Sequence, residues 1–401
     1  MVTAAVGLIE SPLDVARMNF DASAARVLTN PDLRLLLSAC SRDARFQLPI
    51  RLDNGELRLF DAFRTHHSSA LGPHLGALRF SPEVSSGLMF ALAQTLTWKA
   101  ILAEVHFGGA MGGVLCNPEE LSGAEAERIT RAYVAASRSL LGPFHDVLQP
   151  EAESGPQFAG WMHGEYAARF KSVPGGDSGE PAVLASVVGK AESGGGIADR
   201  EQAVLRGVQG LVRRVAEERG KVPGELRVAV SGSSAAVTRG LAVAAGQLGC
   251  KLIETSDARR MDVAGSDAVL QAAADVLILA GKECAVHAGN APGIVAPVIV
   301  EASDLCVTPA ADKILARKGT VVIPSLVGNA ATVVAAHLEW DANLRQVSIG
   351  AAAAGGEIEA RVLKAYDAVR RRAAQHGQTL RAAAYDIALE RAAAVERLRM
   401  P

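Results

Sequence analysis

The sequence has few aromatic residues and no long apolar run. Phe, Trp and Tyr make up only 4% of its 401 residues, so the interior must be built mainly from Val, Leu, Ile and Ala. No window holds the roughly 18 uncharged apolar residues of a membrane span, and no basic N-terminal region leads into an apolar signal segment. We therefore expect a cytoplasmic protein that does not associate with membranes.

An excess of one charge is missing as well. The 41 basic and 43 acidic residues nearly balance, which gives no reason to expect nucleic acid as a partner. The five cysteines are odd in number and form no CxxC pair, so they predict reduced thiols. His66 and His67 would point to opposite faces of a strand, and no further ligand lies at a suitable spacing, so we expect no metal site.

The length predicts two domains, because a single core stops growing below roughly 300 residues. In the first part of the chain, the segments 46–52 and 57–63 flank Asp53-Asn54-Gly55-Glu56, which predicts a β-hairpin. The polar, glycine-rich run 174–181 indicates a boundary or a hinge. We therefore expect an α/β domain over residues 1–180.

The pattern changes after this run to apolar strands separated by helices. Near-continuous apolar runs at such spacing predict a parallel sheet buried on both faces, so we expect a Rossmann-like domain over 181–335. Helical periodicity then continues through 336–401, including an arginine-rich amphipathic stretch at 358–399. The expected strands of the parallel sheet are 226–230, 251–255, 275–280, 297–301 and 320–324.

The most informative stretch is the run from Phe107 to Val114, in which four glycines bracket Met111. Glycines let the backbone approach a ligand closely and aim the remaining side chain at it, so the pattern predicts a loop that presents a functional group. The thioether presented here is apolar and cannot transfer a proton. An isolated methionine would be interpreted as a core residue, but its glycine neighbours favour a functional position.

This run and Leu96-Thr97-Trp98-Lys99 resemble the glutamate/leucine/phenylalanine/valine dehydrogenase family over roughly residues 46–340. The resemblance implies a substrate-binding and oligomerisation domain, a Rossmann-like domain, and C-terminal helices that return to the first domain. It also implies a hexamer. Further motifs that carry it are Gly72-Pro73, Leu78-Arg79-Phe80, Leu141-Gly142-Pro143, Gly189-Lys190, Thr308-Pro309, Asn329-Ala330 and Glu339-Trp340.

Family members deaminate an amino acid and pass hydride to NAD or NADP, and the resemblance implies that this site is damaged here. Met111 replaces the catalytic lysine, and Glu151 takes the place of the proton-relay aspartate. A positioned proton-transfer group is worth about 10² to 10⁴ in rate, so Met111 should nearly silence the reaction. The implied substrate- or effector-binding positions are Lys99, which is retained, Leu75 in place of a lysine, Ala336 in place of a serine, and Arg79.

The implied cofactor site is eroded in the same way. A GxGxxG fingerprint should follow the strand at 226–230, yet only Gly232 is present, with Ser234 and Val237 in place of the other glycines. Asp257 is suitably spaced to hold a ribose hydroxyl. Val204 stands where the family carries a threonine, and Asn329 keeps a family motif. We therefore expect no bound cofactor.

Three functions remain open at this point. The first is a non-catalytic regulatory subunit that assembles with an active glutamate dehydrogenase paralogue and senses an amino acid. The second is an active NAD(P)-dependent dehydrogenase that uses Lys99, Glu151 and His106. The third is a small-molecule binding module that acts alone. We favour the first, because the fold pattern is complete while the reactive positions are altered.

Overall fold

The computed structural model describes residues 10–152, 154–170, 180–232, 235–257 and 268–399. Its contacts divide the chain into two compact units, and each is built from three segments of the sequence. We name them after their sheets. The mixed-sheet unit contains residues 30–204, 332–358 and 391–401, and the parallel-sheet unit contains residues 1–29, 205–331 and 359–390.

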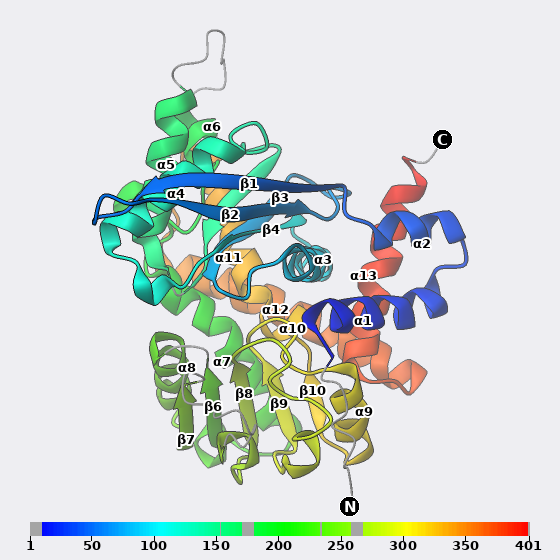
Figure 1. Ribbon diagram of the computed structural model, residues 1–401. Coiled ribbons are helices and arrows are strands. Elements are labelled where there is room, and N and C mark those ends of the chain that lie inside the picture. Colours follow the sequence, from blue (N-terminus) through cyan, green and yellow to red (C-terminus); the bar gives the residue numbers. More distant parts are fainter. Residues whose placement is uncertain (1–9, 153, 171–179, 233–234, 258–267, 400–401) are drawn as a thin grey trace, which may run out of the picture. The chain divides into compact units, whose positions relative to one another are not determined.

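The mixed-sheet unit is built on five strands in the order β1-β2-β4-β3-β5. The β1–β2 and β2–β4 pairs are antiparallel, whereas β3 pairs in parallel with both β4 and β5. Figure 1 shows α3 against one face of this sheet and α4 with α5 against the other. The strands are β1 (Arg42–Arg51), β2 (Leu57–His66), β3 (His74–Ser81), β4 (Gly108–Leu115) and β5 (Asp146–Pro150). The helices are α2 (Pro31–Ser38), α3 (Ser86–Leu102), α4 (Gly123–Ser137), α5 (Gly155–Phe170), α6 (Glu180–Leu184), η1 (Pro118–Glu120) and η2 (Glu192–Gly194).

The predicted hairpin is confirmed by β1 and β2. Gly55 has φ +85°, the left-handed conformation that a glycine adopts without strain. Its N–H donates to the Leu52 carbonyl at 3.0 Å, and the Asn54 side chain accepts from the Glu56 N–H at 2.9 Å. The Asn-Gly pair therefore closes the turn as expected, although both strands are longer than the sequence pattern suggested.

The run of glycines around Met111 is a strand and not a loop, which corrects the prediction. It forms β4, in the middle of the sheet. A Cβ on Gly109 would lie 1.9 Å from the Ala93 carbonyl oxygen in α3, and one on Gly112 would lie 2.1 Å from the Tyr133 hydroxyl in α4. The glycines are thus needed so that helices can pack tightly on both faces of β4.

The parallel-sheet unit contains a five-stranded sheet in the order β10-β9-β8-β6-β7, and every pair in it is parallel. All five predicted strands are present, which confirms the expected Rossmann-like architecture. The strands are β6 (Arg227–Gly232), β7 (Lys251–Asp257), β8 (Val276–Ala280), β9 (Val298–Glu301) and β10 (Val321–Ile323). The other helices among the described residues are α1 (Pro12–Val27), α7 (Arg200–Glu218), α8 (Ala235–Gln247), α9 (Pro309–Arg317), α10 (Ser325–Gly328), α11 (Ala330–Arg345), α12 (Ala351–His376), α13 (Leu380–Arg397), η3 (Pro223–Glu225), η5 (Ala268–Gln271) and η6 (Ala291–Gly293).

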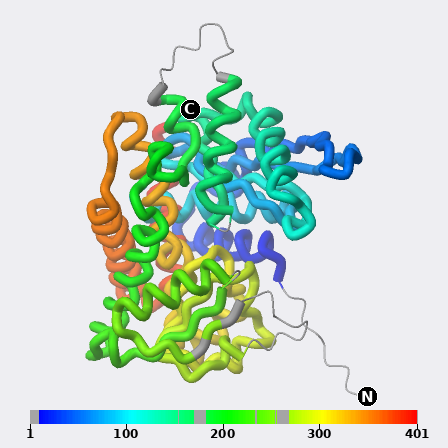
Figure 2. Tube along the Cα trace, turned by 90° about the vertical axis from the view of Figure 1, so that its left-hand side faces the viewer, coloured from blue at the N-terminus to red at the C-terminus, as the bar shows by residue number. Residues whose placement is uncertain are grey.

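Ion pairs join the helices of the parallel-sheet unit. Arg213 pairs with Glu359 and Arg214 with Asp367, so α7 and α12 lie side by side, as the green and orange helices in Figure 2 show. Arg26 of α1 pairs with Asp386 of α13 at 2.7 Å. This last contact explains why the N-terminal helix groups with the parallel sheet, although the sequence pattern placed it in the first domain.

The borders of the two units differ from the boundaries expected after residues 180 and 335. Four of the five borders fall inside α7, α11, α12 and α13, because packing divides these helices while composition marks only loops. The C-terminal residues 391–401 belong to the mixed-sheet unit, but 359–390 belong to the parallel-sheet unit. Most of the predicted hinge at 174–181 lies outside the described residues. Within the described part, no helix is both long and apolar enough to cross a bilayer.

The tight contact between β4 and α3 predicts the effect of a single methyl group. Gly109→Ala should lower the free energy of unfolding by about 1 to 3 kcal/mol or more, because the added Cβ overlaps backbone atoms of Ala93 and Thr97. Gly123→Ala is the matched control, since a Cβ there meets no atom within 4 Å. Urea denaturation of both variants measures the difference, and equal midpoints would contradict this packing.

Candidate functional site

One face of the mixed sheet collects the residues expected to bind substrate. Met111 is paired with Thr65 of β2, and Leu75 is paired with Gly109 of β4. Because paired residues share a face and faces alternate along a strand, Leu75, Arg79 and Met111 point to the same side. Gly109 places this side against α3. Leu75 and Met111 are both buried.

Lys99 belongs to α3, the helix that packs on this face. Ser85 caps the helix by accepting from the Leu88 N–H, and Thr97 accepts a hydrogen bond from the Gly109 N–H at 2.9 Å. The Lys99 side chain is buried. The helix and β4 are therefore joined two residues before Lys99.

Glu151 follows the last residue of β5 and is held by a cation. Arg79 Nε donates to Glu151 Oε1 at 2.7 Å. The Arg79 side chain is 20% exposed and the Glu151 side chain is 24% exposed. Arg79, which was expected to contact the ligand, pairs with the carboxylate that the resemblance places at the proton-relay position. The pair leaves Glu151 poorly suited to act as a base, because a nearby guanidinium stabilises its ionised form.

Ala336 lies in α11 and is fully buried in the same unit. The helix is anchored one turn further on by Glu339, a fully buried carboxylate that accepts from the Gly189 N–H at 2.8 Å and from Lys190 Nζ at 2.8 Å. Burial lowers the pKa of Lys190, and Glu339 opposes that shift. The motif residues Lys190 and Glu339 thus have a structural role in fixing α11.

A buried ion pair on the opposite face of the mixed sheet has no counterpart in the sequence predictions. Arg64 Nε donates to Asp146 Oδ2 at 2.8 Å, and both side chains are fully buried. His66 Nε2 lies 2.7 Å from the same oxygen. Burial alone would raise the pKa of Asp146, but the charge and hydrogen bonds of Arg64 and then of His66 lower it to about 2.

The expected cofactor residues of the parallel-sheet unit lie only partly within the described residues. Gly232 ends β6 and is paired with Asp257 of β7. A Cβ on Gly232 would lie 2.1 Å from Thr238 Oγ1. The side of Gly232 on which a Cβ would lie therefore faces α8. Val237 is half-buried in the first turn of α8. Ser234 and the side chain of Asp257 lie outside the described residues.

Two expected cofactor residues remain, Val204 and Asn329. Val204 is half-buried in α7, and Asn329 ends α10, where its N–H donates to the Ser325 carbonyl at 2.9 Å. With one glycine of three and an aliphatic Val237, the described residues do not fit the glycine-lined turn that a dinucleotide pyrophosphate requires. They also contain no group of three or more His, Cys, Asp or Glu that could hold a metal ion.

The geometry on the Met111 face supports binding better than proton transfer. Arg79 on this face pairs with Glu151, and Leu75 and Met111 are apolar. Lys99 belongs to the helix that packs against this face. His106 is exposed, with its ring 6.1 Å from the ring of His337.

Comparisons with known proteins agree with the fold of both units. Residues 41–168 match the model of the Glu/Leu/Phe/Val dehydrogenase dimerisation domain, and residues 258–399 match that of Glutamate/Leucine/Phenylalanine/Valine dehydrogenase. Glutamate dehydrogenase from Thermotoga maritima is 27% identical over 96% of this chain and 97% of its own. Glutamate dehydrogenase A2 from Halobacterium salinarum is 32% identical over 89% and 90%. The hetero-hexameric glutamate dehydrogenase from Thermus thermophilus, solved with leucine bound, has a TM-score of 0.88 at 29% identity over both complete chains.

The buried Arg64–Asp146 pair predicts that neutralising Asp146 lowers the stability of the fold. Asp146→Asn should destabilise the fold by about 3 to 5 kcal/mol, because it leaves the Arg64 charge buried without a counter-charge. Asp61→Asn is the control, since it removes the partner of an ion pair to the exposed Arg45 and should cost about 1 kcal/mol or less.

The same pair predicts how stability changes in acid. A lowered carboxyl pKa gives stability that is complete above the ordinary value of 3.8 and is lost as the pH falls toward about 2. Denaturant midpoints measured against pH should therefore fall over this window in the wild type and change less in Asp146→Asn. A wild-type curve that is flat over the window would contradict the assignment.

Proposed function

Because the chain belongs to the Glu/Leu/Phe/Val dehydrogenase family, we propose that it is a glutamate dehydrogenase-like subunit without catalytic activity of its own. It assembles with an active NAD(P)-dependent glutamate dehydrogenase and modulates that enzyme. The single observation that carries this proposal is Met111, an apolar side chain at the position that the family resemblance assigns to the catalytic lysine.

The surroundings of Met111 support the loss of chemistry. Deamination needs a group that moves protons beside the substrate, and a thioether cannot do so. Glu151, the other candidate, is held by Arg79 at 2.7 Å. Losing one positioned proton-transfer group costs about 10² to 10⁴ in rate. Two altered positions on one face therefore leave little activity.

Assembly with other subunits is supported by the mixed sheet itself. Strand β1 lies at the edge of the sheet, and only its inner side is paired within the described residues. Such an edge is a ready surface for another chain. The Thermus thermophilus relative is a hetero-hexamer, which supports an oligomer of unlike subunits for this chain too.

An amino acid is the effector that this chain would sense. Lys99 can hold its carboxylate, and Leu75, Met111 and Ala336 offer apolar surface to its side chain. The leucine bound to the Thermus thermophilus relative supports an amino-acid ligand in this family. The chain would not use NAD or NADP, since Gly232 alone remains of the glycine fingerprint.

A second candidate function is an active dehydrogenase with altered residues. It is supported by the relatives, which are named as glutamate dehydrogenases, and by Lys99, which remains on the helix that packs against the Met111 face. In this alternative, Lys99 and Glu151 would carry the reaction. It differs from the first proposal because it requires nicotinamide reduction that depends on Lys99.

Assembly is tested by producing this chain with a tag together with a full-motif glutamate dehydrogenase from the same source. We expect the two chains to purify as one complex, whose rate of glutamate oxidation responds to an added amino acid. A stable tagged protein that leaves the paralogue behind would contradict the proposal.

The role of Lys99 is tested in the same mixed complex. Lys99→Ala should leave assembly intact and weaken the response to the effector about tenfold or more, because a hydrogen bond to a charged group is lost. Lys251→Ala is the control, since this lysine is exposed on β7 of the other unit. The effector response, measured as activity against amino-acid concentration, should be the same in this control as in the wild type.

A further inference from the structure

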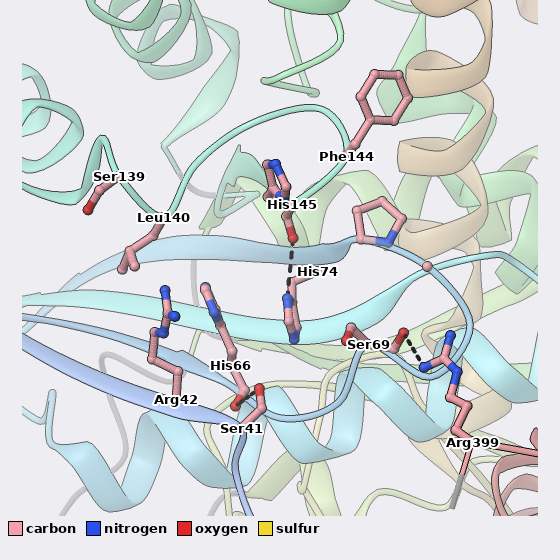
Figure 3. A pocket seen from close by; sticks show the side chains of 12 residues that line it. Ser41, Arg42, His66, Ser69, His74, Ser139, Leu140, Phe144, His145 and Arg399 are labelled. Carbon is pink, nitrogen blue, oxygen red and sulfur yellow. Dashed lines mark hydrogen bonds between the residues drawn. The ribbon is translucent and has the colours of Figure 1, made fainter. Parts of the chain in front are cut away.

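A hollow of about 600 Å³ opens in the mixed-sheet unit, on the side of the sheet that carries the Arg64–Asp146 pair. His66 and His74 line it, and their strand partners are Ala110 and Gly108. These positions alternate with Met111 along β4, so the hollow lies on the opposite face of the sheet. Figure 3 shows the hollow with the two imidazoles in its middle.

The hollow has cationic and polar walls. Arg42, at the start of β1, and Arg399, beyond the end of α13, line it together with Ser41, Ser69 and Ser139. None of the described lining residues is acidic. Figure 3 shows the two arginines on different sides of the histidines. The walls therefore offer guanidinium and hydroxyl donors without a carboxylate to neutralise them.

Neither arginine has a carboxylate partner within the part of the chain that the structure describes. The Arg42 side chain makes no hydrogen bond or ion pair among the described residues, and Arg399 Nη1 donates to the Ser69 carbonyl at 3.3 Å. Many other arginines of this chain are paired; Arg45, three residues along β1, contacts Asp61 at 3.1 Å. Two unneutralised guanidiniums at one hollow leave a net positive site.

Asp146, the carboxylate that contacts His66 at the floor of the hollow, is already paired with a cation. Asp146 accepts from Arg64 and contacts His66, so its charge is not available to a cation in the hollow. His74 stacks on His66 with ring centroids 4.3 Å apart. Its Nδ1 lies 3.2 Å from the His145 carbonyl, and its Nε2 is buried without a partner among the described residues. His74 itself is only 9% exposed.

We propose that this hollow binds a small anion that carries two or more negative charges, such as a phosphate ester or a dicarboxylate. Guanidinium groups match both kinds of oxygen acceptor and bind them through paired N–H bonds. Arg42 and Arg399 hold the anion from two sides, and the serine hydroxyls donate to its remaining oxygens. This site does not depend on the proposed regulatory function, because it uses none of the residues on the Met111 face.

His74, at the floor of the hollow, couples anion binding to the protonation of its ring. Burial, and then the nearby His66, lowers the pKa of His74 to about 4, so its ring is neutral without a ligand. The charged or titratable groups that surround it are His66 and Arg64 of β2, Asp146 of β5, His145, and the two wall arginines. A bound dianion stabilises the protonated ring, so binding strengthens as the pH falls.

Isothermal titration of the full-length protein with sulfate and with succinate tests the site. Sulfate represents the oxyanion of a phosphate ester, and succinate represents a dicarboxylate. We expect saturable binding of at least one of them, weakened about tenfold or more in the double variant Arg42→Ala with Arg399→Ala. The matched control is Arg45→Ala with Arg397→Ala, which removes two exposed arginines from the same elements outside the hollow.

Each result decides one point. Binding of sulfate alone assigns the site to phosphate-type ligands, and binding of succinate alone assigns it to dicarboxylates. Binding of neither anion, or equal binding by the hollow and control variants, overturns the proposal. Loss of the regulatory function would leave all these results unchanged, because the titration needs no partner subunit, amino acid or nucleotide.

The pH arm uses sulfate, which keeps its charge in mildly acidic and mildly alkaline buffer. Wild-type protein should bind it more tightly in the acidic buffer. His74→Asn keeps a donor for the His145 carbonyl but cannot take up the proton, so its affinity should change less between the two buffers. An identical pH dependence in both proteins would overturn the link between His74 and the anion.

Discussion

The close approach of α3 to β4 is the constraint on which the Met111 face depends. It requires glycine at position 109, where any Cβ would overlap backbone atoms of the helix. The Thr97 hydroxyl then bonds to the Gly109 N–H, which fixes the rotation of α3 and with it the side on which Lys99 lies. The same packing that stabilises the sheet therefore sets how the helix that carries Lys99 lies against the strand that carries Met111.

Buried charges divide into those that hold the fold and those that face a possible ligand. Asp146, Glu301 and Glu339 are fully buried and each is bonded to a basic side chain, so they serve the architecture. Burial raises the pKa of Glu301, and Arg381 opposes that change. Glu151 is different, because it is partly exposed and tied to Arg79 beside an apolar surface. The buried ion pairs hold the fold, whereas on the Met111 face Leu75 and Met111 are apolar and Glu151 is paired with Arg79.

The sequence alone predicted the elements that depend on neighbouring residues. An Asn-Gly pair predicted the hairpin, and apolar runs predicted the parallel strands, because both depend on neighbouring residues. The glycines around Met111 were misinterpreted as a loop, since tight helix packing and close ligand approach both require a missing Cβ. Arg64 and Asp146 are 82 residues apart, so no local pattern could pair them. The unit borders inside helices were also out of reach, because composition does not report packing.

The central claim is that the apolar side chain of Met111 leaves this chain without proton-transfer chemistry. Amino-acid-dependent formation of NADH or NADPH by the isolated protein, freed of any paralogue, measures it directly. No formation above the protein-free rate is the result predicted here, for glutamate and for apolar amino acids alike. Turnover that disappears in Lys99→Ala but persists in Lys251→Ala would contradict it and would establish the chain as a working dehydrogenase.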